Sequence, residues 1–312
     1  MARAWPPGLR PRAMLNLRFF RAHWMSSDVI FIHKQPPLRN IGDELCSPRH
    51  YFDLRSARER LAVVGGGVFA DFGERDLARR GLTAQDAVLW GVGRSLKRGS
   101  DSLERIATLP HLAWGLRDID GVADPERFLP CVSCLHPMLD AGAGQDGTLL
   151  FVNAEPRVTP ADGETALRAL AAARGWQFLQ NDCSDQAMRD ALRGNRRVIT
   201  NSFHGAYWSL LSGHDTFVTG YSSKFVSLFR AFGLDPQPIV RYEKPRKLGF
   251  CGRLRGRAGA GLLNGVVQAV DENRVVRLAD SRAMLAAFRE RNLAFAQALV
   301  AEGVLKAYSL RA

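Results

Sequence analysis

The sequence predicts an α/β protein made of two Rossmann-like domains that face each other across a cleft. Short apolar or β-branched runs alternate with helical segments along most of the chain, as in parallel α/β sheets. Several predicted strands end in glycine or charged residues, and open parallel sheets bind ligands at the carboxyl ends of their strands. A glycine-rich linker, 142–147, interrupts the alternation before it restarts.

These features divide the 312 residues into four parts. The first domain covers 28–141, and the second covers 142–278 with an Arg/Gly-rich loop at 245–265 that we expect to be mobile. A basic arm, 1–27, precedes them. The last part, 279–312, holds a long amphipathic helix, 279–306, that we expect to pack back across the first domain.

The net charge of +12 is unevenly distributed. Residues 1–24 carry five Arg and no acid, and residues 241–257 carry seven Lys or Arg against one Glu. A nucleic-acid binder more often carries its charge on a domain face, so we expect no nucleic-acid partner. Basic segments suit peripheral contact with the inner face of an anionic membrane, or serve as solubilising arms.

The cysteines and the N-terminus predict a cytoplasmic protein. The chain contains Cys46, Cys131, Cys134, Cys183 and Cys251. Their number is odd, and Pro and Arg interrupt any apolar leader, which favours reduced thiols. Cys131 and Cys134 lie close to His136, but structural zinc usually takes four ligands from two paired motifs. We therefore expect packing cysteines rather than a redox or metal site, and neither a metal nor a cofactor.

The first domain has four predicted strands, at 29–32, 61–64, 87–90 and 111–114. The first is followed by Asn40, Gly42 and Asp43, with a helix beginning near Leu45 and Asp43 as its candidate cap. This loop is either a helix cap alone or part of a ligand site.

The other strands of this domain end in residues suited to anions. The second leads into Gly65, Gly66 and Gly67. When a glycine-rich loop joins a strand to a helix, its backbone can closely approach a phosphate or a sugar. The run is not G-x-G-x-x-G, so no nicotinamide site is indicated. Arg94 and Arg117 follow the third and fourth strands and can hold a phosphate or carboxylate through two hydrogen bonds.

The second domain repeats the pattern. Its predicted strands are 148–152, 176–179, 198–200 and 216–219, and its predicted helices are 163–174, 184–192, 206–211 and 224–232. Asn153 and Glu155 follow the first strand, and Tyr221 and Lys224 follow the last. All four are candidate substrate-binding residues because they lie at the carboxyl ends of their strands.

The stretch from Arg197 to Lys224, RVITNSFHGAYWSLLSGHDTFVTGYSSK, is the most informative. Asn201 and Ser202 are good N-caps, so we expect free N–H groups at a helix N-terminus, which form an anion site. His204 can give and take a proton near neutrality, and Gly205 permits close backbone approach. The alternative is a capping or packing histidine.

At these residues the chain resembles the polysaccharide pyruvyl transferases. The matching core is ITNSFHGAYWSLLSG, followed by a strand and YSSKFVSLFRAFGL. Family members carry a similar Asn-x-Gly-Asp-x-Leu at the first strand–helix junction and a similar GGG after the second strand. They also often carry Arg-Glu or Arg-Asp followed by serine, where this chain has Arg117-Asp118 without the serine. The matches span 28–235.

The resemblance implies a GT-B-like arrangement and transfer of the pyruvyl group of phosphoenolpyruvate onto a sugar of an exopolysaccharide or other cell-surface glycan precursor. The product is a ketal bridging two hydroxyls, and the basic segments favour a lipid-linked acceptor. Phosphoenolpyruvate needs clustered positive charge and N–H donors, which Arg94, Arg117, Lys224 and 202–205 can supply. His204 is the candidate acid or base. Further candidates, as hydroxyl binders or bases, are Asp43 and Glu155.

Three other functions fit parts of the pattern. A GT-B glycosyltransferase with a nucleotide-sugar donor would need a ribose-binding carboxylate and a base-stacking slot, and neither is identifiable. A non-catalytic protein that binds glycans or membrane surfaces on a decayed enzyme fold would tolerate replacement of His204. A nucleic-acid binder would show a steep salt dependence.

Overall fold

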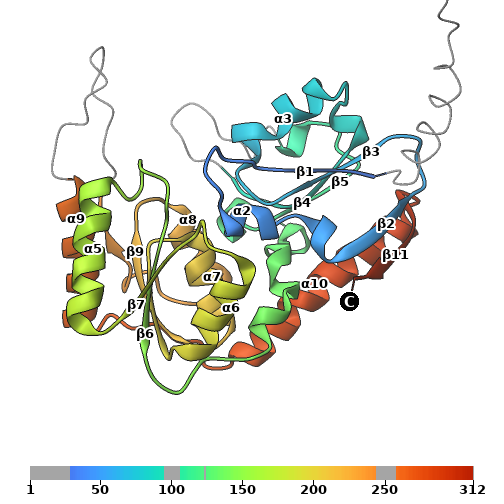
Figure 1. The fold of residues 1–312 in the computed structure, drawn as a ribbon. Helices are drawn as coiled ribbons and strands as arrows, with labels where there is room; N and C mark the ends of the chain where they lie inside the picture. The colour runs from blue at the N-terminus through green and yellow to red at the C-terminus, as the bar shows by residue number, and fades with distance from the viewer. Residues whose placement is uncertain (1–28, 95–105, 123, 244–257, 312) are drawn as a thin grey trace, which may run out of the picture.

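The computed structural model describes residues 29–94, 106–122, 124–243 and 258–311. Within these residues the chain forms two parallel sheets and one antiparallel strand pair, with helices packed between and around them (Figure 1). The mixed α/β class and the parallel sheets agree with the prediction. The basic arm, 1–27, and all but the first residues of 241–257 lie outside the described part.

The first sheet has the strand order β1-β3-β4-β5, and all neighbours are parallel. Its strands are β1 (Val29–His33), β3 (Leu61–Gly65), β4 (Ala87–Val92) and β5 (Ala113–Leu116). Each matches a predicted strand, although β5 begins two residues later than expected. Side chains alternate between the faces, so Val63 and Trp90 join one core cluster while Val64 and Leu89 join another, beneath α3 (Phe69–Arg79).

The helix after β1 is placed differently from the prediction. It is α2 (Ile41–Leu45), so it ends at the residue near which it was expected to begin. Asn40 is its cap, because Asn40 has an extended backbone and its Oδ1 accepts hydrogen bonds from the N–H groups of Gly42 (3.0 Å) and Asp43 (3.4 Å). Asp43 therefore lies inside the helix rather than at its cap.

An antiparallel pair that the sequence did not predict extends from the first sheet. It consists of β2 (Phe52–Ser56) and β11 (Leu305–Leu310), with Leu54 opposite Tyr308. The helix expected over 279–306 consequently ends sooner, at Ala301, and Gly303 turns the chain with φ 69°. Short 3₁₀ helices complete this half: η1 (Pro48–His50), η2 (Ala84–Asp86), η3 (Ile119–Gly121), η4 (Pro125–Arg127), η5 (Val132–Leu135) and η6 (Pro137–Leu139).

The second sheet has the order β10-β9-β8-β6-β7, again with parallel neighbours. Its strands are β6 (Thr148–Val152), β7 (Gln177–Gln180), β8 (Arg197–Thr200), β9 (Asp215–Gly220) and β10 (Val240–Arg241). The predicted strands are all present, and the two-residue β10 is additional.

Helices cover both faces of the second sheet (Figure 1). They are α5 (Ala161–Arg174), α6 (Asp185–Gly194), α7 (Phe203–Leu211), α8 (Lys224–Ala231) and α9 (Ala258–Asp271). Leu150 and Val152 pack toward α5 and α9, whereas Leu149 and Phe151 share a core cluster with α6, α7 and α8. The loop expected at 245–265 is helical from Ala258 onward, because Leu262 and Val266 find an apolar surface to cover.

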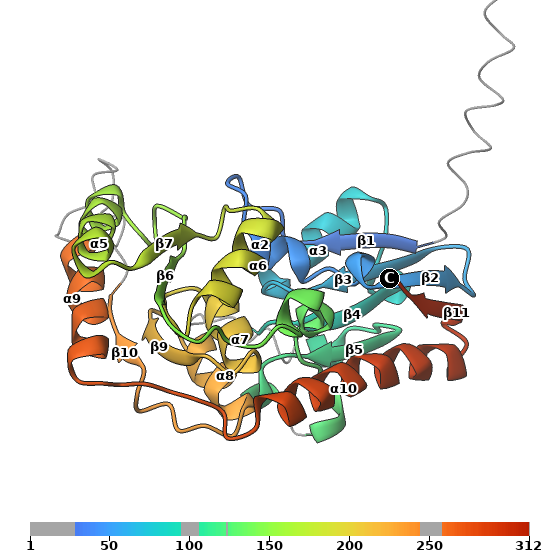
Figure 2. The same cartoon turned by 60° about the horizontal axis from the view of Figure 1, so that its bottom comes forward.

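The helix α10 (Ser281–Ala301) runs from the second sheet to the first (Figure 2). Phe288 packs with Tyr207 of α7, and Leu299 packs with Trp90 of β4. Trp90 Nε1 also donates a hydrogen bond to Asn292 Oδ1 at 2.8 Å. The C-terminal helix therefore contacts residues of both sheets. Among the described residues, no helix has the length and apolar character that a bilayer crossing requires.

Candidate functional site

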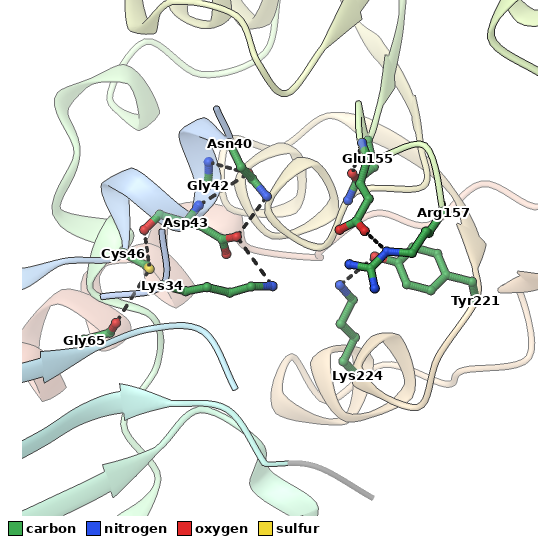
Figure 3. A network of polar contacts seen from close by, with 11 residues as sticks. Lys34, Asn40, Gly42, Asp43, Cys46, Gly65, Glu155, Arg157, Tyr221 and Lys224 are labelled. Atoms are coloured by element: carbon green, nitrogen blue, oxygen red, sulfur yellow. Dashed lines mark hydrogen bonds and ion pairs between the residues drawn. The ribbon is translucent and has the colours of Figure 1, made fainter. Parts of the chain in front are cut away.

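Five polar side chains supplied by both halves of the chain lie near the first turn of α7. They are Lys34, Asp43, Arg117, His204 and Lys224. The same three cations, Lys34, Arg117 and Lys224, act on the pKa of both Asp43 and His204. Figure 3 shows Lys34 and Lys224 pointing toward one another from opposite sides of the site. Each of the five follows the carboxyl end of a strand, which is where parallel sheets place their ligand groups.

Asp43 is held at one side of this site. Its Oδ2 accepts a hydrogen bond from Asn40 Nδ2 at 3.1 Å and lies 3.8 Å from Lys34 Nζ. Burial raises the pKa of Asp43, and Lys34, Lys224 and Arg117 oppose that shift. Asn40 thus serves the site indirectly, because it caps α2 and orients the carboxylate.

Arg117 is a buried cation with unused donors. It is 9% exposed, its guanidinium lies 4.3 Å from the centre of the Phe203 ring, and Gly93 makes room for it. A Cβ on Gly93 would lie 2.9 Å from Nη2. Among the described residues, neither Nε nor Nη1 has a hydrogen-bond partner. Buried polar groups are nearly always hydrogen-bonded, so these two nitrogens of Arg117 are exceptions and are available to an acceptor.

Lys224 approaches from the second sheet. Its Nζ donates a hydrogen bond to Tyr221 Oη at 2.8 Å and lies 4.8 to 5.8 Å from the ring centres of Tyr221, Phe225 and Phe203. Burial lowers the pKa of Lys224 to about 7, and Arg117 contributes to the shift. A lysine with this pKa changes its charge near neutrality, whereas an ordinary lysine does not.

His204 lies in the first turn of α7 and is only 5% exposed. Its Nε2 is 3.6 Å from Cys131 Sγ. A Cβ on Gly42 would lie 2.1 Å from its Nδ1, so only glycine lets α2 approach the ring this closely. Burial lowers the pKa of His204 well below its usual value, and the charge of Arg117 adds to this effect. The imidazole is therefore neutral at pH 7.

The N-terminus of α7 is capped within the protein. Ser202 is the cap, and its Oγ accepts from Gly205 N at 3.4 Å, while Ser202 N donates to Thr200 Oγ1 at 2.9 Å. These two N–H groups are therefore engaged within the protein. Gly205 is needed for packing, because a Cβ there would lie 2.5 Å from both Phe151 Cδ1 and Thr200 Oγ1.

Asn201 does not cap the helix. Its Oδ1 accepts from Asn153 N at 2.7 Å, and its Nδ2 donates to Tyr242 Oη at 3.0 Å. Asn153 in turn accepts a hydrogen bond from Glu155 N at 2.9 Å, and the Glu155 carboxylate is paired with Arg157. Asn153 therefore shapes the loop after β6, while Glu155 lies on the same side of the site as Lys224 (Figure 3).

The glycine run serves packing in this structure. A Cβ on Gly65 would lie 2.4 Å from Pro48 Cδ, and one on Gly66 would lie 1.9 Å from Cys46 Sγ. Gly66 N donates to Trp90 O at 3.3 Å, so this N–H does not face a ligand. Gly66 and Gly67 have φ values of 58° and 63°, in the region that glycine adopts easily.

Arg94 is bound to the segment that follows β5. Its Nη1 donates to Asp120 O at 2.9 Å, and its backbone N–H donates to Asp118 Oδ2 at 2.6 Å. Arg117 is a main influence on the pKa of Asp43, His204 and Lys224, while both arginines act on the pKa of Asp118.

The Cys-x-x-Cys segment does not form a metal site with His136. Cys131 and Cys134 are free and buried, and His136 Nε2 lies 3.3 Å from Asp185 Oδ1 instead. In the described part of the chain, no cluster of His, Cys, Asp or Glu could hold a metal ion. Cys134 lies in the core with Asn292, whereas Cys131 contacts His204.

Sequence reasoning missed Lys34, Gly93 and Phe203. Lys34 follows β1 at the same sheet edge as the predicted residues, so the rule of strand ends could have found it. Gly93 and Phe203 act only through the position of the Arg117 side chain, which no local pattern reveals.

Comparison of the chain with protein-family models, with curated proteins and with solved structures finds no match.

Proposed function

We propose that the chain is a pyruvyl transferase that moves the pyruvyl group of phosphoenolpyruvate onto a sugar of a cell-surface glycan precursor. One observation carries this proposal: Lys34, Arg117 and Lys224 converge on a site where Asp43 is the carboxylate paired with one of them. The excess positive charge and the unused donors of Arg117 suit a small ligand with a phosphate and a carboxylate. Phosphoenolpyruvate carries both groups.

The reaction balances as follows. A proton adds to the methylene carbon C3 of phosphoenolpyruvate, and the electron pair of the C2=C3 bond forms the new C–H bond. One sugar hydroxyl attacks C2 and loses its proton, and phosphate leaves with the electrons of the C2–O bond. A second hydroxyl then attacks C2 and loses its proton. One of these two protons replaces the proton used at C3, and the other leaves with the phosphate.

The side chains present can divide this work. Lys34, Arg117 and Lys224 hold the phosphate and carboxylate and offset their charge. The neutral imidazole of His204 can accept a proton from the attacking hydroxyl. Asp43 and Glu155 border the site and can accept hydrogen bonds from sugar hydroxyls.

We further propose that the two sheets belong to two Rossmann-like domains in a GT-B-like arrangement, with the site between them. The first sheet ends at Leu116 and the second begins at Thr148, which supports the expected boundary near 141 and 142. Ile41 N donates to Asn181 O at 2.8 Å, so α2 joins the two halves beside the site. The acceptor is proposed to be free or lipid-linked, and contact with a membrane surface through 1–24 and 241–257 stays a prediction.

The test is release of phosphate from phosphoenolpyruvate with a panel of free and lipid-linked glycans. We would compare the wild type with His204→Ala and Arg117→Met, and use Arg55→Met, on the exposed face of β2, as the control. Release that depends on an acceptor and is lost in both site variants is expected. Release of a nucleotide from a nucleotide-sugar, without phosphate release from phosphoenolpyruvate, would instead identify a glycosyltransferase.

A further inference from the structure

We propose that Lys224 is the proton-transfer group of this site: it gains a proton when phosphoenolpyruvate binds and donates it to C3. This role rests on the proposed function and deepens it. The uptake of a proton on binding needs no glycan, so it can be measured even if no acceptor is found.

The position of Lys224 suits this role. It is the first residue of α8, and its Nζ is fixed by a 2.8 Å hydrogen bond to Tyr221 Oη. The aromatic rings of Phe203, Tyr221 and Phe225 surround the ammonium and keep water from part of it. The side chain is half-buried and points into the space between Asp43 and Glu155 (Figure 3).

Charged groups from every neighbouring element face Lys224. The cations Arg117, after β5, and Lys34, after β1, disfavour its protonation, while Asp43 of α2 and Asp118 favour it. The imidazole of His204 in α7 is neutral and adds no charge of its own. Burial is the largest influence, and together these groups lower the pKa of Lys224 to about 7.

An anion bound among these cations must raise the lowered pKa of Lys224. A phosphate and a carboxylate close to Nζ favour the charged ammonium, so the pKa of Lys224 rises when phosphoenolpyruvate binds. Above pH 7 the free protein holds this lysine largely as the neutral amine, and binding then draws one proton from solution. Binding of the ligand therefore protonates Lys224, which is the acid that the reaction needs.

The ammonium group of Lys224 can then donate its proton to phosphoenolpyruvate. Its N–H bond breaks, the proton goes to C3, and the C2=C3 electron pair forms the C–H bond, which leaves Lys224 as the amine and C2 open to the sugar hydroxyl. The proton released by that hydroxyl can return to the amine. The ammonium is thus restored, and no oxidant or further reactant is required.

The other titratable groups are less suited to donate this proton. Burial and the charge of Arg117 keep His204 neutral, so it lacks the additional proton that an acid must donate. Asp43 accepts from Asn40 and is paired with Lys34, so its carboxylate is already engaged. Lys224 has a single hydrogen bond, to a neutral hydroxyl, in the described part of the chain.

The first experiment measures proton uptake by titration calorimetry. Phosphoenolpyruvate is titrated into the full chain at about pH 8 in two buffers of different ionisation enthalpy. The wild type is expected to take up close to one proton, and Lys224→Arg, which is always charged, is expected to bind without uptake. Lys306→Arg, on the exposed strand β11, should match the wild type. Equal uptake in Lys224→Arg and the wild type would overturn the role of Lys224.

The second experiment separates binding from proton transfer. Lys224→Arg should keep KM within a few-fold of the wild type but lose about 10²–10⁴-fold in kcat, whereas Lys224→Met should lose both. Tyr221→Phe removes the hydroxyl beside Nζ and should move the pH dependence of kcat/KM. A Lys224→Arg variant with wild-type kcat would refute the proposal. Proton uptake without phosphate release from phosphoenolpyruvate, whichever acceptor is added, would instead show that the proposed function fails while the titration of Lys224 stands.

Discussion

Asn292, at the junction between α10 and β4, and Arg117, in the cation cluster, are both buried, but they differ in how many hydrogen bonds they make. Asn292 accepts from Trp90 Nε1 at 2.8 Å and donates to Pro130 O at 3.3 Å and to Phe288 O at 3.0 Å. Arg117, in contrast, keeps two nitrogens without partners among the described residues. Natural sequences usually satisfy buried polar groups, so the first cluster stabilises the fold and the second is arranged for a ligand.

Substitutions in the two clusters should have opposite effects on activity and stability. Arg117→Met should lower the rate of phosphate release by about 10²–10³-fold, as expected when one preorganised donor is removed. The free energy of unfolding should change little or increase, because the variant loses a buried cation whose Nε and Nη1 have no hydrogen-bond partner among the described residues. Steady-state kinetics measures the expected loss of rate, and urea unfolding of the same sample measures the expected change in stability. A large loss of stability with normal kinetics would assign Arg117 to the fold.

Asn292→Ala should show the reverse behaviour. It leaves Trp90 Nε1 and Pro130 O buried without partners, which costs about 1–3 kcal/mol for each group. We expect a loss of about 2–4 kcal/mol in urea unfolding and nearly normal kinetics. Gln268→Ala, on the exposed side of α9, is the control and should change stability by less than about 0.5 kcal/mol. Similar losses of stability in Asn292→Ala and Gln268→Ala would show that the hydrogen bonds of Asn292 contribute little to the stability of the fold.

Gly42→Ala tests the contact between the two halves of the site. The added Cβ would lie 2.1 Å from His204 Nδ1, so either α2 or the imidazole must move. We expect a loss of stability of about 1–3 kcal/mol together with reduced activity. Gly261→Ala is the matched control, because its Cβ meets no atom within 4 Å and should stabilise α9 by about 0.5–1 kcal/mol. A fully active Gly42→Ala protein would argue that the position of His204 is unimportant.

The smallest effect concerns stability and pH. The folded pKa of Lys224 is about 7 and the unfolded value is near 10.4, so the unfolded state binds more protons between them. Stability should therefore rise with pH across this window, and Lys224→Met should lack that part of the rise. His204 adds a separate loss below about pH 6.5, because its lowered pKa keeps it neutral only in the folded state. Chemical denaturation over this pH range measures both contributions to the free energy of unfolding. Identical pH profiles for the wild type and Lys224→Met would contradict the contribution of Lys224.

The strands were predictable because their signal is local. Runs such as 61–64 and 149–152 are short, apolar on both faces and rich in β-branched or aromatic residues, which is typical of a strand buried in a parallel sheet. The pair β2 and β11 was not predictable, since it joins segments at opposite ends of the chain and alternates buried with exposed residues. The cap at Asn40 was missed because Asp43 is an equally good cap by residue type, and only the backbone conformation distinguishes them.

The sequence alone determined the α/β class, the order of the parallel strands along the chain, and the presence of His204, Arg117 and Lys224 at strand ends. These follow from short-range patterns of side-chain polarity and backbone preference. Only the tertiary structure decided which of these groups meet. It brought Lys34 and Lys224 together from separate sheets, bound Arg94 to Asp120 O, and enclosed His204 against Gly42. It also left two nitrogens of Arg117 without hydrogen-bond partners among the described residues. Burial and charge proximity arise from packing between distant segments, so the proton affinities that define this site exist only in the folded chain.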